Sequence, residues 1–153
     1  MVLTRFKILN LELLNISFMR NCYCCSGDKF EDCCQPVIEG IIKPATAEAL
    51  MRSRYSAYAT VNAEYILQTT HRSARKFHDA DAIKKWAKSS LWQKLEILSI
   101  IKGSPKDFKG IVEFKAYYLD LSLQPQIHHE LSNFVRESGE WFFVDGKIPN
   151  FLK

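Results

Sequence analysis

Apolar residues recur at intervals of three and four over residues 47–61, and this spacing predicts a helix. Thr46 directly precedes the pattern and is a typical N-cap residue. Asn62 interrupts the pattern and predicts the cap of a second, shorter helix over residues 63–71. A third amphipathic pattern predicts a helix over residues 79–90. The stripe of the first helix includes one arginine among its apolar members: Leu50, Met51, Arg54, Tyr55, Tyr58 and Val61.

The period changes to two from Leu91 onward, which predicts β-strands over residues 91–103, 108–121, 125–137 and 140–148. The turn between the last two strands falls at Ser138-Gly139, a pair typical of hairpins. Three helices followed by about four antiparallel strands define an α+β fold. A curved sheet that wraps around the helices would bury one face and could leave a cavity. The residues expected to share a side are Leu91, Leu95 and Ile97 in the first strand; Val112, Phe114, Ala116 and Tyr118 in the second; and Ile127, His129, Leu131, Asn133 and Val135 in the third.

The composition is ordinary for a soluble globular protein, with 153 residues, 47% apolar and 25% charged. No apolar run approaches the ~20 residues that span a bilayer, so we expect a cytoplasmic protein with no membrane partner. Residues 1–18 carry a broken apolar pattern and precede Met19, which predicts a dispensable N-terminal extension. The alternative is an amphipathic helix that packs on the body through Leu9, Leu13 and Ile16.

The net charge of +4 is unevenly spread, because residues 71–94 contain seven basic and two acidic residues. Such a stretch could form a basic surface for an anion or a nucleic acid. The alternative is a solvated helix face, which the scattered charges and the lack of interleaved aromatic residues favour. The basic residues are Arg72, Arg75, Lys76, Lys84, Lys85, Lys88 and Lys94.

All five cysteines lie within residues 21–34, and four of them follow the spacing C-x-C-x8-C-C. Four thiolates on a short turn suit tetrahedral Zn²⁺ with Zn–S distances of about 2.3 Å. Disulfides, an iron–sulfur cluster and redox chemistry are the alternatives; the odd count and local spacing argue against disulfides. We expect a closed, structural Zn²⁺ site with its sulfurs within about 4 Å of one another, and with Cys25 pointing away. The predicted ligands are Cys22, Cys24, Cys33 and Cys34.

The stretch "CYCCSGDKFEDCC" resembles the SEC-C metal-binding motif, which is also found at the C-terminal end of the SecA translocation motor. It matches in its cysteine spacing and in Ser26-Gly27, whereas Cys25 stands where the motif usually has glycine. Three further stretches, "LMRSRYSAY", "YILQTTH" and "ESGEWFFVDGKIPNF", resemble the YchJ-like family of bacterial proteins. This resemblance implies a SEC-C zinc knuckle followed by a cone-shaped nuclear transport factor 2-like (NTF2-like) domain. It supplies no reaction.

The predicted division of the chain has three parts. Residues 1–18 form the extension, residues 19–40 the SEC-C zinc knuckle, and residues 41–153 the NTF2-like α+β domain. The stretch between the cysteines and Thr46 carries two prolines and a glycine, and we expect a linker there.

Arg54 lies on the apolar stripe of the first helix, where a guanidinium is costly unless it finds acceptors. We therefore expect a buried ion pair between Arg54 and Glu130, whose strand should pack over this helix. Of Arg52 and Arg54, one is expected to pair with Glu130 or Asp145 and the other to be exposed. The pair could fix helix against sheet, or it could line a pocket for an anionic or polar ligand.

Two function classes follow from these features. The first is a binding or interaction module whose zinc knuckle contacts a protein or nucleic acid. The second is a small-molecule enzyme or carrier that uses the cavity of the cone. A carboxylate beside Tyr or His in a buried cavity would favour the second class, and a cavity filled by Phe and Tyr the first. The pocket candidates are Arg54, Tyr58, His71, Glu130 and Trp141. Each also has a structural reading, such as core packing for Tyr58 or capping of helix carbonyls for His71.

Overall fold

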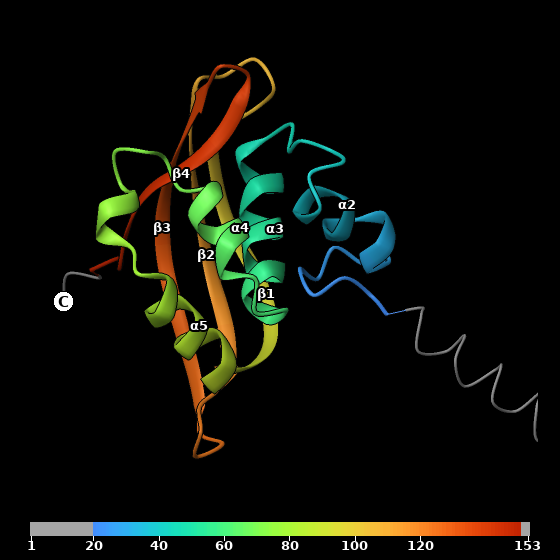
Figure 1. Cartoon of the computed structure of the whole chain (residues 1–153), viewed down its shortest axis with the longest axis vertical. Coiled ribbons are helices and arrows are strands. Elements are labelled where there is room, and N and C mark those ends of the chain that lie inside the picture. Colours follow the sequence, from blue (N-terminus) through green and yellow to red (C-terminus); the bar gives the residue numbers. More distant parts are fainter. Residues whose placement is uncertain (1–19, 151–153) are drawn as a thin grey trace, which may run out of the picture.

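The computed structural model describes residues 20–150, so the predicted N-terminal extension lies outside the described residues. Within these residues, four α-helices and two short 3₁₀ helices precede a four-stranded sheet (Figure 1). The helical elements are η1 (Phe30–Asp32), α2 (Cys34–Ile38), α3 (Ala47–Ala59), α4 (Ala63–Gln68), η2 (Arg75–Phe77) and α5 (Ala80–Ser89). The strands are β1 (Leu91–Lys102), β2 (Lys109–Leu119), β3 (Pro125–Glu137) and β4 (Glu140–Lys147).

Side-chain caps begin the three main helices, and two of them, Thr46 and Asn62, were predicted. Thr46 Oγ1 accepts a hydrogen bond from the Ala49 backbone N–H at 3.0 Å, and Asn62 and Asp79 cap α4 and α5 in the same way. Helix α4 ends at Gln68, before the predicted residue 71. The chain leaves the helix there because Thr70 bridges to Phe143 in β4, and the His71 N–H donates to the Phe143 carbonyl at 2.7 Å.

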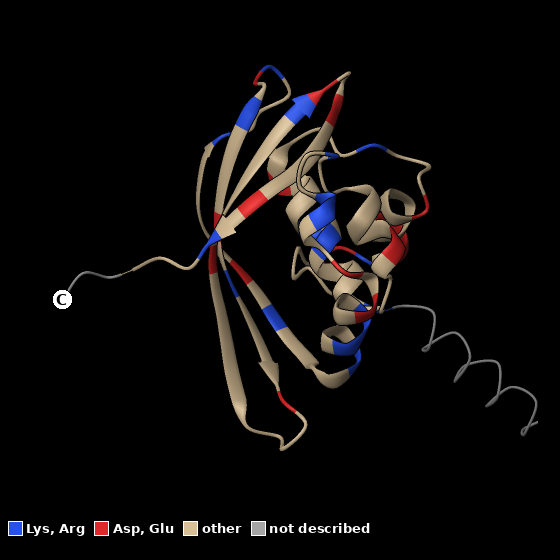
Figure 2. Ribbon diagram, turned by 60° about the vertical axis from the view of Figure 1, so that its left-hand side comes forward, with Lys and Arg blue, Asp and Glu red and all other residues tan. Residues whose placement is uncertain are grey.

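The sheet is an antiparallel meander in the order β1-β2-β3-β4. It curves around the helices, which cover one of its faces (Figure 2). Ser138 and Gly139, both with positive φ, form the predicted β3–β4 turn. The segment expected to be a linker instead begins with α2, which packs against α3. The α+β fold predicted from the sequence is therefore confirmed.

The expected common side of Leu91, Leu95 and Ile97 in β1 is wrong for Leu91. The register of β1 shifts between Trp92 and Lys94, so Trp92 packs against the core whereas Leu91 is 56% exposed. In β3 the residues expected to share a side form the outer face, since Ser132 and Phe134 are 1% exposed and Ile127 is 58% exposed. The even-numbered positions of β3 therefore face the helices.

Helix α3 approaches the β1–β2 hairpin so closely that one site needs a residue without a side chain. A Cβ on Gly110 would lie 2.6 Å from the Gly103 Cα and 3.0 Å from the Ala47 Cβ. The Ala47 N–H also donates to the Gly103 carbonyl at 3.0 Å. This contact fixes the start of α3 against the sheet.

The seven basic residues of the stretch 71–94 are all exposed, as the solvated-face reading expects. Within residues 20–150, no helix has the length and apolar character needed to cross a membrane.

Candidate functional site

The five cysteines lie on a tight N-terminal loop. Its two arms are joined by a bridge between Asn21 and Lys29, and the Cys22 N–H donates to the Asp28 carbonyl at 2.7 Å. Between the arms, Cys25 has φ 61° and Gly27 has φ 92°. A left-handed residue at position 25 explains why the SEC-C motif usually places glycine there, since glycine adopts this conformation without steric cost.

Four sulfur atoms converge across this loop. The Sγ atoms of Cys22, Cys24, Cys33 and Cys34 all lie within 4.8 Å of one another. The Cys24–Cys33 distance is 3.7 Å and the Cys33–Cys34 distance is 3.9 Å. A tetrahedral centre with Zn–S of about 2.3 Å places its sulfurs roughly 3.8 Å apart. Of the six sulfur–sulfur distances, these two fall within the predicted 4 Å, and all six lie within 4.8 Å.

The fifth thiol is directed elsewhere. Cys25 Sγ lies 3.5 Å from the Tyr23 carbonyl, and the Leu95 N–H of β1 donates to it at 3.5 Å. Cys25 is exposed, whereas Cys22, Cys24 and Cys34 are buried. The four remaining residues are free thiols that fit a tetrahedral thiophilic ion in number, distance and donor type.

Burial raises the pKa of one thiol in the cluster. Desolvation raises the pKa of the Cys33 thiol to about 11, and the hydrogen bond from Ser26 only partly opposes this shift. A metal ion binds thiolates, so its binding would release these protons.

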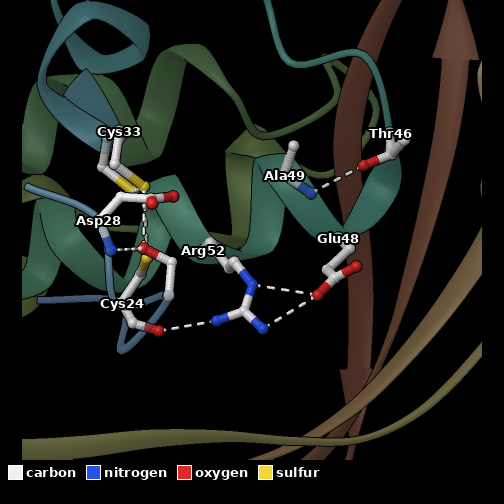
Figure 3. Close-up of polar contacts among 9 residues, drawn as sticks. Cys24, Asp28, Cys33, Thr46, Glu48, Ala49 and Arg52 are labelled. Carbon is white, nitrogen blue, oxygen red and sulfur yellow. Dashed lines mark hydrogen bonds and ion pairs between the residues drawn. The ribbon is translucent and has the colours of Figure 1, made fainter. Parts of the chain in front are cut away.

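The loop is held on helix α3. Arg52 Nη1 donates to the Cys24 carbonyl at 2.8 Å, and its Nε and Nη2 contact Glu48 at 3.0 Å each (Figure 3). Cys22 Sγ lies 3.7 Å from the Ser56 hydroxyl on the same helix. Arg52 was expected either to pair with Glu130 or Asp145 or to be exposed. Instead, it is half-buried and joins the loop to α3.

A cavity of about 240 Å³ lies inside the cone, between the helices and the sheet. Its polar lining residues are Arg54, Tyr58, His78, His128, Glu130 and Ser132. The other lining residues are Met51, Tyr55, Trp86, Trp92, Phe114, Ala116 and Phe143. Three of the five pocket candidates, Arg54, Tyr58 and Glu130, therefore line one cavity.

Arg54 is buried at 5% exposure, as predicted, but its partners differ from the prediction. Its Nη1 donates to the Ile66 carbonyl at 2.9 Å and to the hydroxyls of Thr69 and Thr70 at 2.8 and 3.3 Å. Its guanidinium carbon lies 4.5 Å from the centre of the Phe143 ring. Among the ion pairs of residues 20–150, none joins Arg54 to Glu130. The predicted direct pair is wrong because the end of α4 supplies neutral acceptors closer to Arg54. Desolvation lowers the Arg54 pKa to about 10.

Glu130 is held by its own strand. Its Oε2 lies 2.6 Å from His128 Nε2, and its Oε1 accepts from the Ser132 hydroxyl at 2.6 Å. Burial alone would raise the Glu130 pKa, but the hydrogen bonds from His128 and Ser132 outweigh it and leave the pKa below its ordinary value. His128 and His129 face opposite sides of the sheet, because His129 instead contacts Glu113 at 2.8 Å.

The other two pocket candidates lie outside this cavity. His71 Nε2 contacts Glu137 at 2.6 Å, and its ring lies against Phe142. Trp141 is buried at 2% exposure and donates from Nε1 to the Ala45 carbonyl at 3.1 Å, which is a structural role.

Ten of the thirteen lining residues were not among the five candidates, and His78, Trp86, Trp92 and His128 belong to these ten. The available signal was in β3, where polar residues alternate at positions 128, 130 and 132. Polar side chains that face the helices must find hydrogen-bond partners inside the protein. A row of them therefore indicates a cavity with a polar lining rather than a packed apolar core.

Gly146 of β4 makes room for the Glu130 carboxyl group. A Cβ at this position would overlap the carboxyl atoms of Glu130. We expect Gly146→Ala to fold, because only the end of a flexible side chain must move, but to separate Glu130 from His128. The measurement is the ring ¹⁵N and ¹H shifts of His128 by NMR. In a Glu130→Ala background the same substitution should leave these shifts unchanged, and a shift of equal size there would contradict the steric account.

Comparison with known proteins agrees with the fold and the loop. A family model described as "YchJ, middle NTF2-like domain" matches residues 46–146. A UPF0225 protein of Geobacter sulfurreducens is 43% identical over 125 residues, covering 82% of this chain and 77% of that protein. The solution structure of a SEC-C motif containing protein from Rhodopseudomonas palustris superposes with a TM-score of 0.78 at 37% identity, covering 86% of this chain and all of the other. The crystal structure of a SEC-C motif containing protein from Psychrobacter arcticus gives a TM-score of 0.73 at 34% identity, covering 89% of this chain and 86% of that one.

A four-cysteine loop docked on an α+β cone defines a SEC-C protein with an NTF2-like domain. The chain belongs to the YchJ-like family, whose relatives include the UPF0225 proteins.

Proposed function

We propose that this protein is a small-molecule-binding protein of the cytoplasm, with a structural zinc ion in its N-terminal loop. The observation that carries the binding role is the cavity of about 240 Å³. Glu130 lies beside His128 in its lining, and Arg54 and Tyr58 line the same cavity. This is the arrangement that favours an enzyme or carrier over a pure interaction module. Surveyed ligand pockets are commonly ~300–1,000 Å³, so a small ligand is expected.

The zinc role rests on the four converging sulfurs. Thiolates select soft or borderline ions, and Zn²⁺ with four cysteines is the common closed structural centre. All four positions would be taken by protein ligands, which leaves none for a substrate water. Clustered cysteines with metal-binding spacing are typical of proteins in a reducing compartment, which supports the cytoplasm as the location.

The metal identity is tested by native mass spectrometry and elemental analysis of the purified full chain. One zinc ion per chain supports the proposal. One iron per chain with visible absorption, or no metal after expression in zinc-supplemented medium, would overturn it.

The binding role is tested with benzamide, a neutral aromatic probe, followed by NMR shifts of the residues that line the cavity. We expect saturable shifts in the wild type and their loss in Ala116→Leu, which fills the cavity from β2. Lys115→Met, on the outer face of the same strand, is the matched control and should bind as the wild type does. The protein or nucleic-acid partner expected for the knuckle stays a prediction.

A further inference from the structure

We propose that the cavity selects a small planar carboxylate, whose oxygens are bound by Arg54 and whose ring lies among the aromatic side chains. This inference rests on the proposed binding role and names the chemical class of the ligand.

The first support is the unused side of the Arg54 guanidinium. All hydrogen bonds that the described chain gives Arg54 come from Nη1, and they end on a carbonyl and two hydroxyls. Nη2 and Nε have no protein acceptor within residues 20–150, although the side chain is 5% exposed and lines the cavity. A guanidinium offers five N–H donors in a planar fork that matches a carboxylate.

The second support is charge. The acceptors that hold Arg54 are a carbonyl and two hydroxyls, which are neutral. The Thr69 and Thr70 hydroxyls can accept from Arg54 because each donates its own hydrogen bond to a backbone carbonyl. No carboxylate of the described chain lies within ion-pair distance of Arg54, and Glu130 already accepts from His128 and Ser132. A buried charge without a contacting counter-ion is costly, and an anionic ligand supplies that counter-ion.

The third support is the polarity of the remaining groups. The Tyr58 hydroxyl has no hydrogen bond to the rest of the described chain, and burial raises its pKa, so it remains a donor. Burial also lowers the pKa of His78, which keeps this ring neutral as it faces the cavity. The unused polar atoms therefore include mainly donors, and the ligand should bring acceptors.

The fourth support is the shape of the walls. The rings of Trp86 and Trp92 lie 5.3 Å apart at 68°, and Tyr58 lies 5.2 Å from Trp86. The cavity volume of about 240 Å³ gives room for one small ring with a carboxylate. Aromatic walls favour a planar body.

The experiment compares benzoate with benzamide, which has nearly the same shape but no charge. We expect benzoate to bind at least about tenfold more tightly, because hydrogen bonds to charged partners are the stronger ones. Titrations are followed by NMR on the full chain with its metal bound. In the wild type, benzoate should also shift the Arg54 Nε–H resonance, which requires no substitution.

The outcomes separate the two proposals. If benzamide binds as tightly as benzoate, the carboxylate inference is overturned while the binding role survives. If neither probe binds up to solubility, both are overturned. Arg54→Met should reduce the preference for benzoate to less than about threefold while keeping benzamide binding. Should Arg54→Met fail to fold, Arg54→Lys keeps the charge but loses the fork, and it should weaken benzoate binding alone. An unshifted Arg54 Nε–H signal in benzoate-saturated wild type contradicts the inference.

Discussion

Cys34→Ser is expected to abolish metal binding and to lower the melting temperature by many degrees. Cys34 is 3% exposed, and its sulfur completes the four-cysteine cluster. A structural zinc ion contributes folding free energy directly, about 10–16 kcal/mol in isolated zinc-finger peptides. Here the cone has a core of its own, so only part of that free energy should appear in global stability. A loss of about 3 kcal/mol already lowers the melting temperature by roughly 6–12 °C at this size.

The effect should reach beyond the loop, because Cys22, Cys24 and Cys34 belong to the same buried cluster as Leu50 and Tyr55 of α3. Thermal melts of the wild type with and without a chelator, read by circular dichroism, should reproduce the loss seen in Cys34→Ser. Amide NMR signals should vanish first in the loop and α2, while the sheet persists.

Cys25→Ser is the matched control, since Cys25 is exposed and its sulfur lies outside the cluster. It should keep the metal and melt close to the wild type. A chelator that leaves the wild-type melt unchanged, or a Cys25→Ser variant as unstable as Cys34→Ser, would remove the metal centre from the account of stability.

The features that could be predicted from sequence are those that depend on local physics. Thr46, Asn62 and Asp79 begin helices because a side-chain oxygen accepts a free N–H of the first turn, and this needs only neighbouring residues. The cysteine cluster was predictable for the same reason, because its ligands lie on one short loop. Ser138-Gly139 follows the same rule, since both residues adopt the positive φ that the turn requires.

The predictions that were wrong concern contacts between distant segments of the chain. Arg54 takes its acceptors from residues twelve to sixteen positions along the chain, where α4 ends. Its burial could be predicted from the helical stripe, but the choice between the α4 terminus and Glu130 depends on how α4 packs. Arg52 likewise reaches back to Cys24, a contact that no sequence spacing indicates.

In β3 a period of two defines the two sides of the strand but does not determine which side faces the helices. Both faces of this strand alternate plausibly, since the odd positions carry Ile127 and Val135 and the even positions carry Phe134. The apolar content favours the odd face. The structure has the opposite arrangement: the even positions face the helices and line the cavity with polar side chains such as Glu130. A one-residue shift in register exchanges the two faces completely, so the stability of variants on each face shows which one is buried.

Phe134→Ala is expected to destabilise the protein by about 3–5 kcal/mol, the usual cost of removing a fully buried phenylalanine. Phe134 is 1% exposed and packs against Phe143 at a ring distance of 5.9 Å. Ile127→Ala, on the same strand, should change the stability by less than about 0.5 kcal/mol, because Ile127 is 58% exposed. Urea unfolding of both variants with metal bound measures the difference.

If Phe134→Ala does not fold, Phe134→Leu offers a milder deletion that should still cost more than Ile127→Ala. The reverse order, with Ile127→Ala the more damaging variant, would mean that the odd-numbered face of β3 is the inner one. Glu130 and His128 would then point away from Arg54, and the cavity could not select a carboxylate in the way proposed. The stability of two variants on one strand therefore also tests the inner wall on which the binding proposal depends.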